Sequence, residues 1–391
     1  MRHDVPDSST GEEISLFSHP EEAILVERPN RFLMIVRDSN GCTLKAHCPN
    51  PGKLTEFIVP GQALLIERHE NPDRTTQCTA VAVRYKGKTI PLYSAKANLA
   101  AKELILPRLY PGTHIIPEWT SGSSRFDFLL KGDPDRIIEV KSCSLVEHGL
   151  GMFPDTPTDR GSRHLQEMIS HVHAGYRAAV LFIISHPDAA QFMPNPHTDP
   201  EFCIHLHRAS NYMPIYAVSM ATDPKGYSRI IDTSVPVDTA YPASLAKENC
   251  GVYLLMIQLA EPLRLPISSL DNAILRPGWY MYVGSAKKHL HQRIARHKRA
   301  HKHAHWHIDY LTMAASSAPQ AYPISTRKDL ECELAKDAAH IADKSIAGFG
   351  CSDCSCRSHL FFFTEKPTNR QAVVDLLFYY RHVKFRESES R

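Results

Sequence analysis

The sequence predicts a multidomain α+β protein, in which a small β-barrel or sandwich is followed by two units that alternate strands with helices. Three observations support this fold class. Short strand-like runs separated by turn residues fill 22–91, an α-β-β-α-β order follows in 92–221, and a second strand–helix unit occupies 250–364. The chain has 391 residues, of which 43% are hydrophobic. That is enough apolar material for a separate core in each unit.

The region 22–91 is predicted to be β-structure because its apolar runs are short and are interrupted by turn signals. The runs are AILVERPNRFLMIVRD, TLKAHC, GQALLIERH and AVAVRY, and the clearest turn is Pro49-Asn50-Pro51-Gly52. Short strands at this spacing are typical of a small barrel or sandwich. Residues 1–21 are polar and are expected to form a leader without regular structure.

The region 92–221 is predicted to be an α/β domain. The helical stretch AKANLAAKELIL precedes two strands at 126–130 and 136–145. An amphipathic helix follows, because apolar residues recur at helical spacing, at Leu165, Met168, Ile169 and Val172. The apolar run 178–184 completes the pattern as a buried strand.

The remaining boundaries follow from breaks in these patterns. Residues 222–249 lack periodicity and contain three prolines, so they are predicted to be a linker. In 250–364, two strands precede a basic helix at about 287–299, a helix at about 328–343, a cysteine-rich turn and the strand HLFFF. Residues 365–391 are predicted to form a C-terminal helix and tail.

Composition excludes several classes of protein. The balance of 43% hydrophobic and 22% charged residues excludes a disordered or collagen-like chain. The longest apolar runs are too short to cross a membrane, and the polar N-terminus does not resemble a signal peptide. Ten scattered cysteines do not suggest a disulfide framework. A cytoplasmic location, in a bacterial cell, is therefore expected.

A first candidate site lies on the two strands of the α/β domain. Alternation along IIEVK places Glu139 and Lys141 on one face, and Asp127 on the preceding strand can meet them across the turn. Paired carboxylates suit a cation such as Mg²⁺, and a nearby lysine can orient water or stabilise charge on a phosphate. The alternative is an ordinary cross-strand ion pair.

Longer motifs carry a family resemblance over residues 22–220. These motifs are AHCPNPGKL (46–54), ERHENPDR (67–74), SSRFDFLL (123–130), IIEVKSCSL (137–145) and FPDTPTDRGSRHLQEM (153–168). They resemble the sugar fermentation stimulation protein A family, which implies an OB-like barrel in 22–91 joined to a PD-(D/E)XK nuclease-like domain in 92–221. Pro51, Ser142 and Ser144 depart from the residues usual in this family, but the acidic and lysine positions are kept.

The resemblance implies roles for individual residues. Asp127 and Glu139 take the metal positions, and Lys141 takes the catalytic lysine position. Other polar residues of the motifs are expected to line the site, namely Arg125, Asp155, Arg160 and His164, and of these Arg125, Arg160 and His164 are candidates for contact with nucleic acid. An OB-like barrel also implies binding of nucleic acid on a basic, aromatic-bearing face, for which the candidates are Arg31, Phe32, Lys45, His47 and Arg74. Each of these is equally compatible with an ordinary surface or core position.

A second resemblance covers about 250–363. Gly251-Val252-Tyr253 and Tyr282-Val283-Gly284 match the halves of the GIY-YIG nuclease motif, and HWHIDYL, ECELA and GFGCSDCSCRSHL follow. The unit therefore resembles a GIY-YIG-like family, in which a tyrosine assists water, an arginine stabilises phosphate and a glutamate binds one divalent metal. By resemblance these roles fall to Tyr253 or Tyr282, to Arg293, and to a glutamate of ECELA.

The helical pattern chooses between the two glutamates of ECELA. Glu331 falls within the arc of Leu330, Leu334 and Ala338, whereas Glu333 points away from it. A charge on a buried face needs a partner, and a metal ion is one. Glu331 is therefore the predicted metal ligand, with a capping carboxylate as the alternative.

Two further features of this unit have open interpretations. Residues 281–310 carry seven Lys and Arg residues against one acidic residue, Asp309. Beside a nuclease-like core, contact with phosphate is expected from this segment, with His297 and Lys298 as candidates. A solvated charged face is the alternative. The spacing C-x2-C-x-C-x2-H can close a zinc site or mark reduced structural thiols, at Cys351, Cys354, Cys356 and His359.

The leading hypothesis is a DNA-binding nuclease that uses Mg²⁺ or Mn²⁺ at one or both sites to hydrolyse phosphodiester bonds. Nucleic acid, most readily DNA and possibly single-stranded, is the expected partner. The alternative is a non-catalytic DNA-binding regulator of sugar metabolism genes, which the family name implies. A structural or interaction module is a third hypothesis, and it predicts no salt-dependent affinity for nucleic acid.

Overall fold

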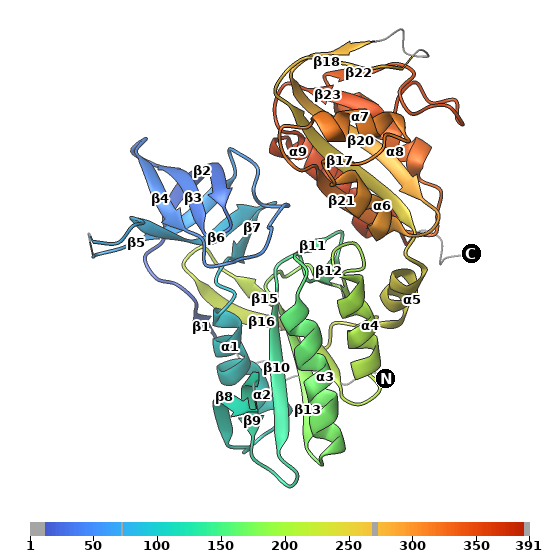
Figure 1. Cartoon of the computed structure of the whole chain (residues 1–391). Coiled ribbons are helices and arrows are strands. Elements are labelled where there is room, and N and C mark those ends of the chain that lie inside the picture. Colours follow the sequence, from blue (N-terminus) through green and yellow to red (C-terminus); the bar gives the residue numbers. More distant parts are fainter. Residues whose placement is uncertain (1–11, 72, 123, 268–272, 387–391) are drawn as a thin grey trace. The chain divides into compact units, whose positions relative to one another are not determined.

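The computed structural model describes residues 12–386 apart from 72, 123 and 268–272, and it divides into two compact units between Ala243 and Ser244 (Figure 1). The first unit contains the barrel and the first α/β domain. The second contains the GIY-YIG-like region. No helix within the described ranges is long and apolar enough to span a bilayer.

Five strands of the first unit close into a barrel. They are β2 (Glu21–Asn30), β3 (Leu33–Asp38), β4 (Thr43–His47), β5 (Ala63–Arg68) and β6 (Cys78–Tyr85). Strands β2, β3 and β4 pair in sequence, and β5 bridges β2 and β6. A parallel pairing of β4 with β6 completes the closure. Alternate side chains such as Met34, Val36 and Ala46 fill the barrel. This strand order is that of the predicted OB-like barrel.

The α/β domain is built on a mixed sheet whose centre is parallel. Strand β13 (Arg177–Ile184) lies between β10 (Arg136–Cys143) and β15 (Ile215–Thr222), parallel to both. The antiparallel strands β9 (Ser124–Leu130) and β8 (Ile115–Ser121) continue the sheet beyond β10. Nearly every residue of β13 is buried, as expected for a strand covered on both faces.

Helices cover both faces of this sheet (Figure 1). Helices α3 (Asp159–His173) and α4 (Pro200–Ala209) pack on one face, against Ile137, Val180 and Phe182. Helices α1 (Lys96–Ala100) and α2 (Leu106–Leu109) pack on the other, against Ile138 and Leu181. A small additional sheet joins β11 (Val146–Glu147), β12 (Leu150–Phe153) and β14 (Gln191–Pro194), and β7 (Lys88–Pro91) pairs with β6 and β15.

Two of the predicted irregular segments contain regular structure. The expected leader forms β1 (Ile14–Ser15), which pairs with β16 (Tyr227–Asp232), and it buries Leu16 and Phe17. The expected linker holds that same β16, which also pairs with β15, and then α5 (Ala240–Glu248). These predictions were wrong because each segment is too short or too polar to show periodicity, and its structure comes from pairing with distant strands.

The second unit is a five-stranded sheet with helices on both faces. The sheet order is β21 (Gln320–Ser325), β17 (Gly251–Leu259), β20 (Gly278–Ala286), β23 (Leu360–Phe363) and β22 (Lys344–Ser345). Helices α6 (Leu290–His297) and α7 (His307–Ala314) pack on one face. Helices α8 (Glu331–Ile341) and α9 (Gln371–Tyr379) pack on the other. A two-stranded ribbon, β18 (Leu263–Arg264) with β19 (Ile274–Leu275), lies between β17 and β20 in the chain.

The predicted C-terminal helix is part of this core. Val373, Leu377 and Tyr380 are buried in the same cluster as Leu334 of α8. The predicted boundary at residue 364 therefore separates segments that pack together.

Candidate nuclease sites

The structure brings the three predicted residues of the first site together. Glu139 and Lys141 lie on the same face of β10, and the Lys141 ammonium is 2.5 Å from Glu139 Oε1. Asp127 comes from β9, where its Oδ2 accepts a hydrogen bond from the Val140 backbone N–H at 2.8 Å. Asn98 of α1 donates to the other oxygen, Oδ1, at 2.8 Å. These bonds fix the carboxylate of Asp127 against the strand that carries Glu139.

A histidine from α3 completes this cluster. His164 is buried, and its Nδ1 lies 2.7 Å from Glu139 Oε1. Arg160, one turn earlier, donates to His164 Nε2 at 3.3 Å. The ring therefore accepts from Arg160 and donates its Nδ1 proton to Glu139. The expectation that His164 contacts nucleic acid directly is wrong, because the ring lies inside the protein beneath Arg160, which is itself exposed.

The electrostatics of the two carboxylates differ. Burial and the charge of Glu139 raise the pKa of Asp127. Burial also acts to raise the pKa of Glu139, but Lys141 and His164 outweigh it and hold that pKa below its usual value. Glu139 Oε2 is buried and has no hydrogen-bond partner among the described residues. The cluster thus holds negative charge that its own cations only partly compensate.

A loop of the barrel contacts the α/β domain through a second acidic group. Asp155 accepts from the Leu54 backbone N–H at 3.2 Å, and a Cβ on Gly52 would lie 2.1 Å from Asp155 Oδ2. Arg28 holds this loop in place, because its guanidinium donates hydrogen bonds to the carbonyls of Asn50, Gly52 and Lys53. The glycine is therefore required by the close approach of Asp155.

A buried carboxyl group that the sequence did not predict, that of Glu56, lies beside Asp155. Glu56 is 2% exposed, and its Oε1 has no hydrogen-bond partner among the described residues. Burial, together with the charge of Asp155, raises the pKa of Glu56 to about 8. A glutamate in a turn between apolar residues carries no periodic signal, so the sequence alone did not show its burial.

The remaining predicted contacts of the first unit lie on the surface. Arg31 follows β2, His47 ends β4, Arg74 lies between β5 and β6, and all three are exposed. Phe32 is 54% exposed, which is unusual for an aromatic ring and fits the surface position expected of it. Arg125 is also exposed and lies 3.5 Å from Glu118 of the adjacent strand.

The second site is built around two tyrosines on adjacent strands. Tyr253 of β17 and Tyr282 of β20 have ring centroids 6.3 Å apart. A Cβ on Gly284, which pairs with Tyr253, would lie 2.5 Å from the Tyr253 hydroxyl and 2.8 Å from the Tyr282 ring. The glycine of the Tyr282-Val283-Gly284 motif is thus the residue that lets both rings lie against the sheet.

Arg293 and Glu331 meet at this pair of strands. Arg293 of α6 donates to the Ser285 carbonyl at 2.6 Å, and the Ser285 hydroxyl donates to Glu331 Oε2. Burial raises the pKa of Tyr253 well above its usual value, and Arg293 acts in the opposite direction. Glu333, by contrast, is exposed and pairs with Lys384 at 2.8 Å. The preference for Glu331 over Glu333 therefore agrees with the geometry.

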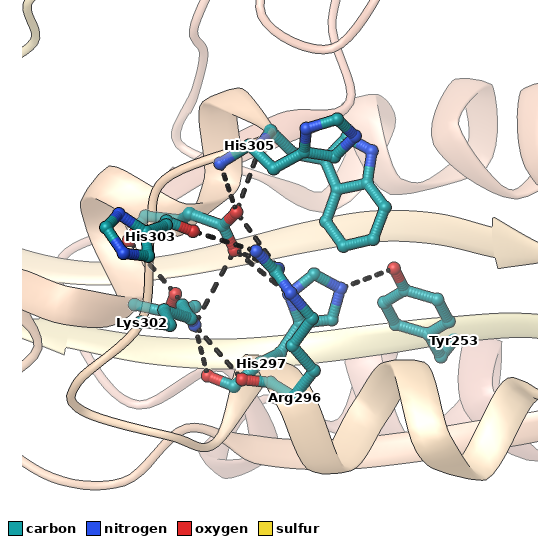
Figure 2. A network of polar contacts seen from close by, with 9 residues as sticks. Tyr253, Arg296, His297, Lys302, His303 and His305 are labelled. Atoms are coloured by element: carbon teal, nitrogen blue, oxygen red, sulfur yellow. Dashed lines mark hydrogen bonds and ion pairs between the residues drawn. The ribbon is translucent and has the colours of Figure 1, made fainter.

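Part of the basic segment contacts the buried Asp309, through Arg296 and Lys302, which are labelled in Figure 2. The Asp309 carboxylate is fully buried and accepts from Arg296 at 2.8 and 3.0 Å and from two backbone N–H groups, those of His305 and Trp306. Lys302 lies 3.6 Å away and donates to Thr312 and to the His297 carbonyl. Arg296 and Lys302 are therefore structural cations rather than phosphate contacts.

His297 belongs to the same buried region. Its Nε2 lies 2.9 Å from the Tyr253 hydroxyl (Figure 2), and the ring is 1% exposed. Burial lowers the pKa of His297 to about 4 despite the nearby Asp309. A direct role for His297 in binding nucleic acid is thus contradicted, and the neutral ring instead holds Tyr253. Lys298, the next residue, is exposed.

The cysteine-rich turn forms a cluster with a composition different from the predicted one. Cys354, Cys356 and His359 are joined by Cys332 of α8, and the four ligand atoms lie within 4.8 Å of one another. Cys351 is outside the cluster, and its thiol donates to the Phe349 carbonyl at 3.3 Å.

Comparison with known proteins follows the same division of the chain. Residues 26–92 match the family described as the SfsA N-terminal OB domain, and residues 94–226 match the sugar fermentation stimulation protein RE domain. A sugar fermentation stimulation protein homolog of Moorella thermoacetica is 41% identical over 222 residues, which cover 55% of this chain and 95% of the relative. The chain belongs to the sugar fermentation stimulation protein family. It carries an additional region at 252–380 that matches the domain of unknown function DUF123, which is GIY-YIG-like.

Other members of the sugar fermentation stimulation protein family match the same share of the chain. A homolog from Syntrophotalea carbinolica is 34% identical over 230 residues, covering 57% of this chain and 96% of the relative. The solved structure of Pyrococcus furiosus SfsA in complex with Ca²⁺ is 28% identical and superimposes with a TM-score of 0.52. That match covers 57% of this chain and 99% of the archaeal one.

Proposed function

We propose that this protein is a divalent-metal-dependent nuclease that hydrolyses phosphodiester bonds in DNA. The observation that carries the proposal is the buried Oε2 of Glu139, which lies beside the carboxylate of Asp127 and has no hydrogen-bond partner among the described residues. Two carboxylates that share a buried site repel each other unless a cation joins them. The proposal applies to the Asp127–Glu139–Lys141 site and, as a second nuclease site, to the Tyr253–Arg293–Glu331 site.

The residues present fit Mg²⁺ or Mn²⁺. Asp127 and Glu139 offer carboxylate oxygens, which are the ligands these ions prefer, and Asp127 is already fixed by Asn98 and Val140. The complex of the Pyrococcus furiosus relative with Ca²⁺ supports binding of a divalent ion by this fold. When bound, such an ion supplies Lewis-acid stabilisation of charge on the phosphate and lowers the pKa of a coordinated water.

The chain's own residues supply the remaining requirements of hydrolysis at the first site. Lys141 is 14% exposed, so its ammonium reaches the site while Glu139 holds it in place. It orients the attacking water and stabilises the negative charge that develops on the phosphate. Arg160 is exposed above His164 and is suited to bind a neighbouring phosphate. His164 fixes the orientation of Glu139.

The second site has the parts for the same reaction from different residue types. Arg293 is half-buried beside the two tyrosines and is placed to stabilise the phosphate, and Glu331 would hold the divalent ion. Tyr253 hydrogen-bonds to the neutral His297. With the ring proton on Nδ1, on the side of Asp309, Nε2 accepts from the phenol and strengthens the tyrosine oxygen as an acceptor for the proton of water. Tyr282 lies closer to the surface and is suited to contact the substrate.

A purely DNA-binding regulator is less well supported. Paired carboxylates weaken the attraction of a protein surface for anionic phosphate, so a protein that only binds DNA gains nothing from Asp127 and Glu139. If Asp127 and Glu139 bind a divalent cation, the cation offsets their negative charge and they no longer weaken the attraction for phosphate. The regulator remains the alternative that the experiment tests.

The decisive experiment measures cleavage of single-stranded DNA, double-stranded DNA and RNA by the full chain with Mg²⁺, Mn²⁺ or EDTA. Wild type is compared with Lys141→Ala, Glu331→Ala and the double variant. We expect metal-dependent cleavage that only the double variant abolishes. Loss in one single variant assigns the activity to that site alone. Tight, salt-sensitive DNA binding without cleavage by wild type contradicts the proposal and favours the regulator.

A further inference from the structure

Four soft ligands converge at one end of α8. Cys332 lies in the first turn of this helix, Cys354 and Cys356 lie in the loop that follows β22, and His359 immediately precedes β23. Their sulfur and nitrogen atoms all lie within 4.8 Å of one another. His359 Nε2 is 3.4 Å from the Cys354 sulfur. Residues more than twenty positions apart in the sequence are thus brought to one point by the fold.

The spacing of these atoms suits a tetrahedral ion. Zn–S bonds of about 2.3 Å and Zn–N bonds of about 2.0 Å place tetrahedral ligands about 3.5–3.8 Å apart. The observed separation of 3.4 Å between His359 Nε2 and the Cys354 sulfur matches this value. The wider separations close with small side-chain rotations, since Cys332 is exposed and lies at a helix end.

The other side of the histidine ring faces a carboxylate. His359 is 2% exposed, and its Nδ1 lies 3.5 Å from Glu331 Oε1. Histidines that bind metal through one nitrogen typically donate the other N–H to a carboxylate, which fixes the ring orientation. Here the ring is aimed with Nε2 toward the thiols and Nδ1 toward Glu331, as that arrangement requires.

We propose that Cys332, Cys354, Cys356 and His359 bind one structural Zn²⁺, and that Glu331 orients His359 for this role. Three thiolates and an imidazole are soft ligands that select zinc over magnesium or calcium. Four protein ligands complete the tetrahedron, so no position is left for substrate and the site is structural. The ion would tie the loop 349–357 and the start of β23 to the start of α8. The proposal does not depend on nuclease activity.

Cys351 provides a matched control that the structure itself supplies. The sequence spacing alone would include Cys351, but its thiol is directed to the Phe349 carbonyl. Cys351 and Cys332 therefore make opposite predictions. Replacing either removes one thiol from the same neighbourhood, and only Cys332 removes a ligand.

The experiment measures zinc per chain in the full-length protein, purified without chelator under reducing conditions, by plasma mass spectrometry. We expect one zinc per chain in wild type and in Cys351→Ser, and none in Cys332→Ser. Circular dichroism checks that each variant is folded. Titration of metal-depleted wild type with Co²⁺ gives an independent readout, because tetrahedral thiolate ligation produces intense visible and charge-transfer absorption. That readout holds even if Cys332→Ser fails to fold.

Glu331→Gln tests the orienting role. We expect it to keep the zinc stoichiometry but to weaken zinc affinity by about 10- to 100-fold in competition with a chelating dye. Unchanged affinity overturns the role of Glu331. The zinc site itself is overturned by wild type that binds neither zinc nor cobalt, or by loss of zinc in Cys351→Ser with retention in Cys332→Ser.

Discussion

Two buried acidic groups in this protein differ in how completely they are satisfied. Asp309, in the second unit, accepts hydrogen bonds from Arg296 and from two backbone N–H groups, with Lys302 nearby. Glu139, in the first unit, uses Oε1 for both Lys141 and His164 and leaves Oε2 without a partner among the described residues. Both oxygens of Asp309 are hydrogen-bonded within the protein, whereas Glu139 Oε2 is not hydrogen-bonded to any described residue.

This difference distinguishes a carboxylate with a structural role from a carboxylate that is available to bind a cation. Removing one partner of a buried, fully hydrogen-bonded ion pair is costly, because it leaves an uncompensated charge, and Arg296 and Lys302 are positioned around Asp309 in this way. A buried charge with an open oxygen costs free energy in the absence of a ligand. Such a cost is tolerated where a cation is to be bound. We therefore interpret Asp309 as a structural anchor and Glu139 as a metal ligand.

The largest expected effect is the loss of metal binding when Glu139 is replaced. Isothermal titration of the full chain with Mn²⁺ should show that Glu139→Ala no longer binds at the first site. Affinity for nucleic acid should hold or rise, because a negative charge is removed. The control is Glu118→Ala, which removes an exposed carboxylate from the neighbouring strand and should leave Mn²⁺ binding intact. Unchanged Mn²⁺ stoichiometry in Glu139→Ala would remove this residue from the metal site.

Replacing Asp309, the fully hydrogen-bonded carboxylate, should lower the stability of the fold instead. Asp309→Asn leaves Arg296 and Lys302 without a counter-charge in the interior, so we expect a loss of about 3–5 kcal/mol in the free energy of unfolding of the second unit. Hydrogen exchange of β17 amides in the full chain measures it. Asp375→Asn, at an exposed position of α9, is the control. A loss below about 1 kcal/mol would show that Asp309 is not an anchor.

Arg293 sharpens the same contrast within the basic segment, because it faces the tyrosine pair rather than Asp309. In a Lys141→Ala background, Arg293→Ala should lower the rate of DNA cleavage by about 10²–10³, as expected for loss of a group that stabilises transition-state charge. The fold should be retained. Arg299→Ala removes an equal charge from an exposed position and should change the salt dependence of binding more than the rate. Cleavage at an undiminished rate without Arg293 would exclude it from the site.

The smallest expected effect concerns Glu56, a second incompletely satisfied carboxyl group. Its pKa is about 8 in the folded protein, above the ordinary value of 4.5. The stability it contributes is present below about pH 4.5 and is lost as the pH rises through 8, because the ionised form is disfavoured in the fold. Glu56→Gln cannot ionise and should be more stable than wild type at pH 8, by on the order of 1–3 kcal/mol.

Urea unfolding at pH 5 and pH 8 measures this difference. At pH 5 the variant and wild type should unfold at similar urea concentrations, since Glu56 is then protonated. Glu70→Gln, at an exposed position, should show no such pH dependence. A Glu56→Gln variant that loses stability equally at both pH values would mean that the ionised carboxylate is needed by the fold.

The sequence predicted the fold class, and it predicted which residues of the two candidate sites share one face of a strand or helix. Alternation along β10 placed Glu139 and Lys141 together, and the helical arc of α8 chose Glu331 over Glu333. The order of domains is confirmed by the family matches at 26–92, 94–226 and 252–380. These features depend on local periodicity or on motifs, and both can be recognised in the amino-acid sequence.

The features that the sequence did not predict depend on contacts between distant segments. Cys332 and Cys354 come together only because α8 begins beside the loop that precedes β23, whereas local spacing suggested Cys351. Arg296 and His297 are basic by composition, but Asp309 and Tyr253 turn them inward. The strand β16 lies in a segment without periodicity. It is a strand because it pairs with β1 and β15, and the local sequence does not show this pairing.

Glu331 and Cys332 are consecutive residues at the start of one helix. Glu331 belongs to the tyrosine–arginine site and also faces His359, whereas Cys332 belongs to the cysteine cluster. Successive helical residues point about 100° apart, so the two clusters can share this end of α8 only in one register. An insertion or deletion of a single residue just before the helix would misplace both side chains together. Over evolution, the tyrosine–arginine site and the cysteine cluster of this unit are therefore expected to be retained or lost as a pair.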